Sequence, residues 1–152
     1  MSVHARRRVA TPCAVGCLPA LLLIGSLAGC GGSNPYSTVK VSGKVTYEDG
    51  SLIQAESIEL IFQPQVDALD QKTSPRPGQA TVNVADGTFS CVSTYGYGDG
   101  VIPGKHKIAV RPIQGGVPAQ GVVPAAYMDP KKTPLVQTIE SAAPLELTIP
   151  KR

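Results

Sequence analysis

The feature that most constrains the fold of this chain is an alternation of apolar and polar residues, which recurs in short segments between residues 38 and 149. It is clearest over 105–111, where His106, Ile108 and Val110 share one face and Lys105 and Arg111 lie on the other. A period of two places every second side chain on the same side of a β-strand. No stretch after residue 30 has the 3.6-residue apolar period of an amphipathic helix. The chain beyond residue 30 is therefore predicted to consist of strands.

Turn and loop sequences separate these segments. Asp49-Gly50 and Asp86-Gly87 predict tight turns, because glycine readily takes positive φ. Stretches rich in Gly, Pro or polar residues predict long loops at 64–78, 94–104 and 112–134. The predicted strands are 38–47, 57–63, 79–84, 88–93, 105–111, 135–139 and 145–149. Seven short strands over about 115 residues predict one all-β domain, an antiparallel β-sandwich.

A different pattern precedes residue 30. Arg6-Arg7-Arg8 is followed by an apolar run over 14–24 and by mostly small residues over 25–29. This order of basic, apolar and small residues is typical of a secretory signal peptide. Gly and Pro interrupt the apolar run, which is shorter than the roughly 20 residues that a membrane-spanning helix needs. Residues 1–29 are therefore predicted to be a signal peptide.

The end of this signal resembles the lipobox of bacterial lipoproteins. The matching residues are Leu27, Ala28, Gly29 and Cys30. The resemblance implies cleavage before Cys30 and attachment of lipid to its thiol and its new amino group, and more than one acyl chain is the condition for stable membrane anchoring. Plain secretion and an uncleaved anchor are the alternatives. The expected parts are a signal peptide at 1–29, a lipidated cysteine with a flexible tether at 30–37, and the sandwich domain at 38–152.

The resemblance also implies a location. The protein is expected to be exported and anchored to a membrane of the cell envelope, with its domain facing the periplasm or the exterior. Gly31 stands where an Asp is the usual cue for inner-membrane retention, which favours the outer membrane in a cell that has one.

Without the predicted signal peptide, the chain has a different net charge and fewer cysteines. The net charge of +3 equals the contribution of Arg6, Arg7 and Arg8, so residues 30–152 hold 11 basic and 11 acidic side chains. A neutral domain without a basic cluster gives no reason to expect nucleic acid as a partner. With Cys30 lipidated, Cys91 is the one cysteine left, which excludes a disulfide within the mature chain.

Several motifs, in order, are similar to those of carboxypeptidase regulatory-like domains. They are Val41-Ser42-Gly43-Lys44-Val45, Ala85-Asp86-Gly87-Thr88-Phe89, Pro103-Gly104-Lys105-His106-Lys107-Ile108-Ala109-Val110, Pro124-Ala125-Ala126-Tyr127 and Thr133-Pro134-Leu135. The resemblance covers nearly all of 38–150 and implies a single seven-stranded, transthyretin-like Greek-key sandwich. It further implies a non-catalytic accessory or structural module. His106 departs from the family, which usually has Tyr there.

No catalytic, metal-binding or cofactor-binding set is predicted. His106 is the only histidine of the mature chain, and a position in phase with Ile108 predicts a packed, hydrogen-bonded residue. Cys91, in phase with Phe89, is predicted to be a small buried hydrophobe. A Cys91–His106 pair is the one catalytic alternative, and it requires both strands to meet in one sheet. A metal site would need further ligands, and the chain has no calcium-loop motif.

Three loop tyrosines are the candidates for ligand contact. Tyr95, Tyr97 and Tyr127 lie on predicted loops, where aromatic rings can stack on sugars or bind a protein partner. Packing over the end of the sandwich is the alternative for Tyr95 and Tyr97. The sequence thus predicts a membrane-anchored envelope lipoprotein with a non-catalytic binding or structural module, whose partner is an envelope protein or a glycan. The alternative function is a carbohydrate-binding accessory protein.

Overall fold

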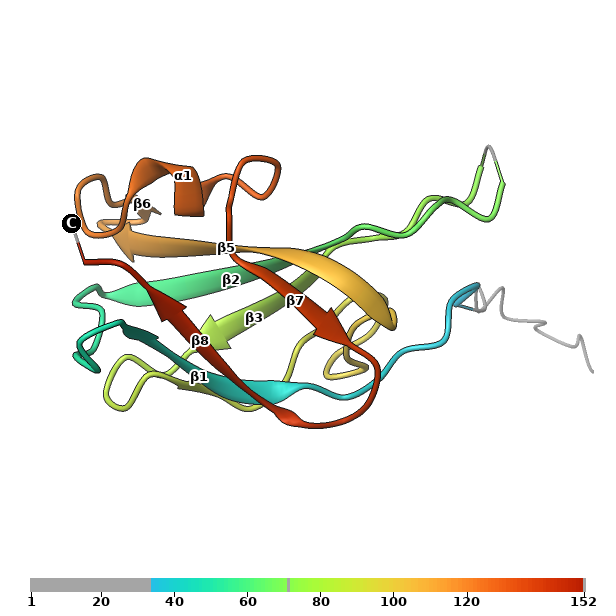
Figure 1. Cartoon of the computed structure of the whole chain (residues 1–152), viewed down its shortest axis with the longest axis horizontal. Helices are drawn as coiled ribbons and strands as arrows, with labels where there is room; N and C mark the ends of the chain where they lie inside the picture. Colours follow the sequence, from blue (N-terminus) through green and yellow to red (C-terminus); the bar gives the residue numbers. More distant parts are fainter. Residues whose placement is uncertain (1–33, 71, 152) are drawn as a thin grey trace, which may run out of the picture. The chain divides into compact units, whose positions relative to one another are not determined.

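The computed structural model describes residues 34–70 and 72–151, and these form a β-rich unit of two sheets (Figure 1). The predicted signal peptide, the predicted lipobox residues Leu27, Ala28, Gly29 and Cys30, and the predicted tether up to residue 33 lie outside the described residues. Among the residues that are described, no helix is both long enough and apolar enough to cross a membrane. The prediction of an all-β domain is confirmed.

The smaller sheet has the order β4-β1-β8. Its strands are β1 (Ser42–Tyr47), β4 (Thr88–Phe89) and β8 (Pro144–Ile149). β4 is antiparallel to β1, but β8 runs parallel to β1, so the prediction of a wholly antiparallel sandwich is wrong. β1 starts at the end of the domain where the chain enters. β8 starts at the same end, because the preceding strand β7 of the other sheet ends there (Figure 1).

A glycine allows β8 to lie against β1. Gly43 pairs with Leu145, and a Cβ atom built on Gly43 would lie only 2.8 Å from the Leu145 amide nitrogen. Any side chain at Gly43 would therefore push the two backbones apart.

The larger sheet has the order β3-β2-β5-β6, and β7 also pairs with β5. Its strands are β2 (Ser57–Pro64), β3 (Gly78–Val82), β5 (Gly104–Gln114), β6 (Val117–Pro118) and β7 (Val136–Ile139). All its pairings are antiparallel. Two elements were not predicted: β6, which makes eight described strands rather than seven, and the one-turn helix α1 (Ala125–Met128).

The strand predicted over 88–93 is shorter than expected because the chain changes partners within it. β4 pairs with β1 at Phe89, whereas Ser93 pairs with Gln79 beside the other sheet. The alternation shifts by one residue at this change. Val92 is completely buried, and Cys91, predicted to point inward, is half-buried at the surface.

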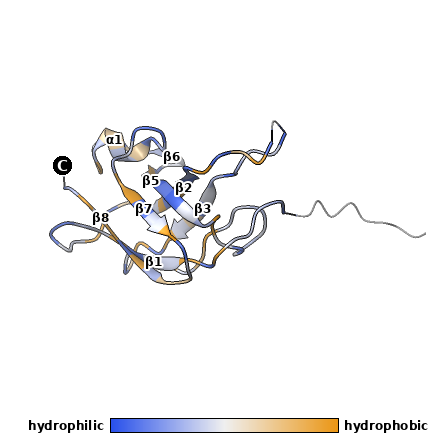
Figure 2. Ribbon diagram, turned by 45° about the vertical axis from the view of Figure 1, so that its right-hand side comes forward, coloured by the Kyte–Doolittle hydropathy of each residue, from blue (hydrophilic) through white to orange (hydrophobic). Residues whose placement is uncertain are grey.

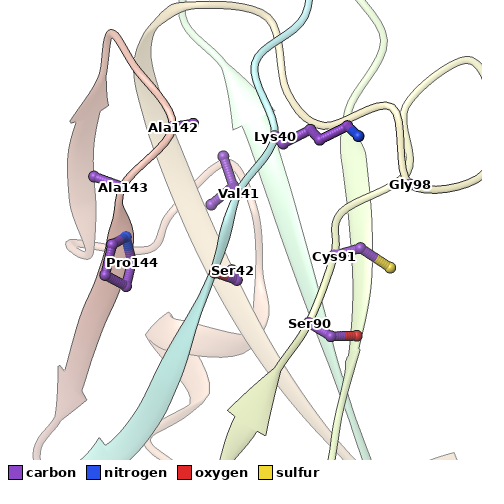
Figure 3. Close-up of a pocket in the computed structure, with 9 residues that line it drawn as sticks. All are labelled: Lys40, Val41, Ser42, Ser90, Cys91, Gly98, Ala142, Ala143 and Pro144. Carbon is purple, nitrogen blue, oxygen red and sulfur yellow. The ribbon is translucent and has the colours of Figure 1, made fainter.

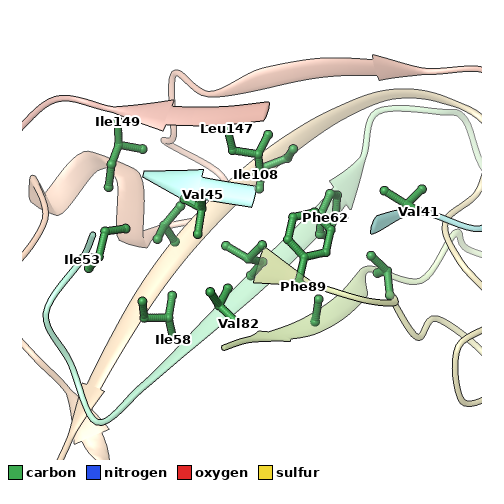
Figure 4. Packing of buried hydrophobic residues seen from close by; sticks show 14 of the residues in the cluster. Val41, Val45, Ile53, Ile58, Phe62, Val82, Phe89, Ile108, Leu147 and Ile149 are labelled. Carbon is green, nitrogen blue, oxygen red and sulfur yellow. The ribbon is translucent and has the colours of Figure 1, made fainter. Parts of the chain in front are cut away.

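The hydrophobic core lies between the two sheets and takes side chains from both (Figure 4). Side chains at alternate positions of β2, β5 and β8 are buried there, among them Ile58, Leu60, Phe62, Ile108, Val110, Leu147 and Ile149. Phe62 and Phe89 bring the sheets together with ring centroids 5.9 Å apart. This packing gives the domain a core of its own.

Tyr36 packs against the domain, although it lies within the segment 30–37 that was predicted to be a flexible tether. Tyr36 is 9% exposed, and its hydroxyl donates to the Thr73 carbonyl (2.9 Å) and accepts from the Leu69 N–H (3.2 Å). Leu69 and Thr73 belong to the connection between β2 and β3, whose described residues, 65–70 and 72–77, are here called the hairpin arm. Further on, Val39 and Val101 exchange two backbone hydrogen bonds of 2.8 and 3.0 Å.

Candidate functional site

A single carboxylate organises the loop over 94–100. Asp99 accepts the backbone N–H groups of Thr94 (2.7 Å), Tyr95 (3.0 Å) and Gly96 (3.0 Å). Burial raises the pKa of Asp99, but these three donors together outweigh it and hold the pKa below its usual value. The loop is therefore a defined structure that fixes the directions of its two tyrosines.

Tyr95 points inward and joins three segments. Its ring stacks on Tyr36 of the incoming chain, with centroids 6.3 Å apart, and the guanidinium of Arg76 lies 5.3 Å from its centroid. Its hydroxyl is buried without a hydrogen-bond partner among the described residues. Tyr95 is thus a packing residue, as the alternative reading of this loop predicted.

Tyr97 points outward and is 95% exposed. It stands between two shallow grooves of about 360 and 450 Å³ that share Gln79, Ser93 and Tyr97 in their linings. The first, here called the Tyr97 groove, is largely polar and is lined by Glu59, Gln79, Thr81, Ser90, Ser93 and Tyr97, among others. It combines one exposed aromatic ring with a carboxylate, an amide and hydroxyls.

The structure does not bring Tyr127 to this site. Tyr127 lies in α1 and packs, partly buried, against the hydrophobic core. The three predicted tyrosines therefore divide into one exposed ring and two packing residues. Sequence reasoning missed Glu59, Gln79 and Thr81, although they are the outward-facing residues of predicted strands and the alternation could have identified them.

Cys91 and Ser90, which also line the Tyr97 groove, line an adjoining cleft of about 380 Å³, shown in Figure 3. Ser90 and Cys91 form one wall, the segment 142–144 forms the other, and the chain at Lys40 and Ser42 lies between them. No histidine lines this cleft in the part of the chain that the structure describes.

His106 instead lies in the core, 1% exposed, as predicted. Its Nδ1 is 3.1 Å from the Gly104 carbonyl oxygen, and its ring packs edge-on against Phe62. Burial lowers the pKa of His106, so the ring is neutral at pH 7. The Cys91–His106 pair is not formed among the described residues, because His106 is buried in the core with its Nδ1 on the Gly104 carbonyl, whereas Cys91 is half-buried at the surface.

Metal ligands do not gather within 34–70 and 72–151, where no three His, Cys, Asp or Glu side chains come together as a candidate site. Comparison with protein-family models, with curated proteins and with solved structures finds no match to this chain. Fold and site together define the class as an all-β domain that carries an exposed aromatic ring beside a polar surface groove.

Proposed function

We propose that this protein is a lipid-anchored component of the cell envelope whose β-domain is a non-catalytic binding module. The observation that carries the proposal is the sequence Leu27-Ala28-Gly29-Cys30, which follows a basic and apolar segment and directly precedes the domain. The outer membrane is the proposed location where the cell has one, and the domain faces the periplasm or the exterior.

The proposal includes the finer architecture. A transthyretin-like, carboxypeptidase regulatory-like Greek-key domain is supported by the two-sheet all-β structure and by the order of the motifs along the chain. Each of the seven predicted segments overlaps a described strand or bridge, and β6 is an addition within the long loop. Modules of this kind act through their surfaces rather than through assembled catalytic groups.

Replacing Cys30 by alanine is expected to abolish incorporation of a fatty-acid probe by the full-length protein in bacterial cells. The thiol that accepts the diacylglyceryl group is then missing, and the membrane fraction should no longer contain lipidated mature protein. Labelling with an alkyne fatty acid, followed by immunoblotting of membrane and soluble fractions, measures both effects. Cys91→Ala is the matched control and should label like the unchanged protein. Full labelling of Cys30→Ala would refute the anchor.

A second function, carbohydrate binding, is favoured by Tyr97. A ring that is 95% exposed on an ordered loop can stack on the apolar face of a sugar. The neighbouring Glu59, Gln79 and Thr81 offer acceptors and donors for sugar hydroxyls. We propose that the Tyr97 groove is the binding surface of the module and that an envelope glycan is its ligand in this second reading.

Tyr97→Ala is expected to weaken binding to immobilised envelope polysaccharides at least about fivefold, since the stacking of a nucleic-acid base on one aromatic ring is worth on the order of 1–3 kcal/mol and a sugar face stacks on the ring in a similar way. Tyr97→Phe keeps the ring and should retain most of the binding. Affinity electrophoresis measures the change, and circular dichroism should show the same fold in all three proteins. Equal retention of Tyr97→Ala and the unchanged protein, or no retention of either, would reject the glycan reading.

A further inference from the structure

The point at which the chain enters the described domain is fixed by its contacts. Tyr36 hydrogen-bonds to both sides of the hairpin arm, at Leu69 and Thr73, and its ring stacks on Tyr95. Figures 1 and 2 both show the arm projecting from the same end of the domain at which the chain arrives. A membrane anchor attached to a residue shortly before Tyr36 therefore restrains the end of the domain that carries the hairpin arm.

The length of chain before this point is short. Cys30 is six residues before Tyr36, and even fully extended these residues reach only about 21 Å, at about 3.5 Å per residue. β5, with 11 residues, spans about 36 Å at about 3.3 Å per residue. β6 pairs with the far end of β5, at Ile113 and Gln114, and so lies at the end opposite the arm. A lipid on Cys30 thus holds the arm end close to the bilayer and leaves the β6 end far from it.

The tip of the arm exposes one large apolar side chain, Leu69. Leu69 is 63% exposed although its backbone N–H is held by Tyr36. The charges of the arm balance, with Asp67 and Asp70 against Lys72 and Arg76. The carboxylate of Asp70 is occupied within the turn, where it accepts the N–H groups of Lys72 and Thr73, both at 2.7 Å. Arg76 lies over the Tyr95 ring rather than at the tip, so the balance holds for the arm as a whole, which carries no net repulsion from lipid phosphates and leaves the side chain of Leu69 exposed.

We propose that the tip of the hairpin arm, at Leu69, contacts the bilayer, so that the domain stands on the membrane with its arm toward the lipid and its β6 end away. This inference rests on the proposed lipidation of Cys30. The Tyr97 groove lies along the outer side of β2 and β3 and then opens sideways, parallel to the membrane surface. The arm thereby orients the binding surface of the module.

The test uses the absence of tryptophan from this chain, which makes any introduced tryptophan a unique reporter. Leu69→Trp places it at the tip of the arm, and Val117→Trp places it on β6, at a residue that is equally exposed, 63% in both cases. Each variant is expressed from the full-length sequence, and the acylated mature protein is purified from membranes and reconstituted into phosphatidylethanolamine–phosphatidylglycerol vesicles that contain lipids brominated on their acyl chains. Quenching and the emission maximum are then compared between the two variants.

Leu69→Trp should show a blue-shifted emission and at least about twofold stronger quenching than Val117→Trp, since interfacial side chains enter the boundary between headgroups and acyl chains by about 5–10 Å. Equal quenching at both positions, or stronger quenching at 117, would overturn the inference. Mass spectrometry of the same samples separates the two levels of the argument. Protein that carries no lipid refutes the proposed function and this inference with it, whereas acylated protein with an unquenched reporter at 69 refutes the inference alone.

Discussion

Gly100→Ala is expected to lower the free energy of unfolding by about 3–5 kcal/mol, which places it among the severe single substitutions. Gly100 has φ of +98°, a conformation that L side chains rarely adopt. A Cβ atom there would also overlap the carbonyl oxygen of Val39. Val39 cannot simply withdraw, because two backbone hydrogen bonds hold it to Val101. The substitution therefore has to break the contact between the incoming chain and the loop that carries Tyr95 and Tyr97.

The same loop offers a matched control for this prediction. Gly96 lacks positive φ, and a Cβ built on it meets nothing within 4 Å. Gly96→Ala should change the free energy of unfolding by no more than about 0.5 kcal/mol, as is usual for surface substitutions. Urea unfolding of the mature chain, followed by circular dichroism, compares the two. Similar midpoints for both variants would show that the close approach at Gly100 does not constrain the loop.

The strands were predictable from the sequence, because a strand that buries one face has apolar residues at every second position. Ile58, Leu60 and Phe62, at every second position of the strand predicted over 57–63, are all buried. The turns at Gly50 and Gly87 were predictable too, and both glycines have φ of +77°. These features depend on neighbours in the sequence alone.

The direction and the partners of the strands were not predictable in this way. Alternation assigns a residue to a face, but it is the same whether the neighbouring strand is parallel or antiparallel, so the parallel pairing of β8 with β1 left no signal. The exchange of core positions between Cys91 and Val92 has the same origin, because it follows from a change of partner strand. α1 occupies a single turn, too short for a helical period, and the segment before it is held by a tertiary contact, a 2.6 Å hydrogen bond from the Tyr47 hydroxyl to the Val122 carbonyl.

The site was predictable in its composition but not in its geometry. An irregular loop has no period, so nothing in the sequence distinguishes the half-buried Tyr95 from the exposed Tyr97. The direction of each ring follows from Asp99, whose three backbone contacts reach back across the loop. The one local signal was the Asp99-Gly100 pair at the end of a glycine-rich stretch, which is typical of a turn.

Asp99→Ala is therefore expected to affect both stability and binding. Three N–H groups lose a charged acceptor, and because water reaches part of this loop, the loss in the free energy of unfolding should be about 2 kcal/mol rather than the full sum of three bonds. Tyr97 loses its fixed position beside the groove, so any binding that depends on its ring should weaken as well. Asp67→Ala, which removes an exposed carboxylate of the hairpin arm, is the control and should change neither property.

The pH dependence of this effect identifies its cause. Folding lowers the pKa of Asp99 below its ordinary value of 3.8, so the carboxylate stabilises the domain in its charged form. That contribution is fully present above the pKa of the unfolded chain and is lost as the pH falls through the lower pKa of the folded state.

The pKa values of Asp49, Asp70 and Asp86 are lowered as well, but these residues are common to the unchanged protein and Asp99→Ala, and their contributions cancel in the difference between the two. The difference in unfolding free energy between the unchanged protein and Asp99→Ala, measured in urea, should therefore stay constant from pH 7 to about pH 5 and shrink below about pH 4. A difference that persists unchanged into strong acid would mean that the charge of Asp99 does not hold the loop that directs Tyr97.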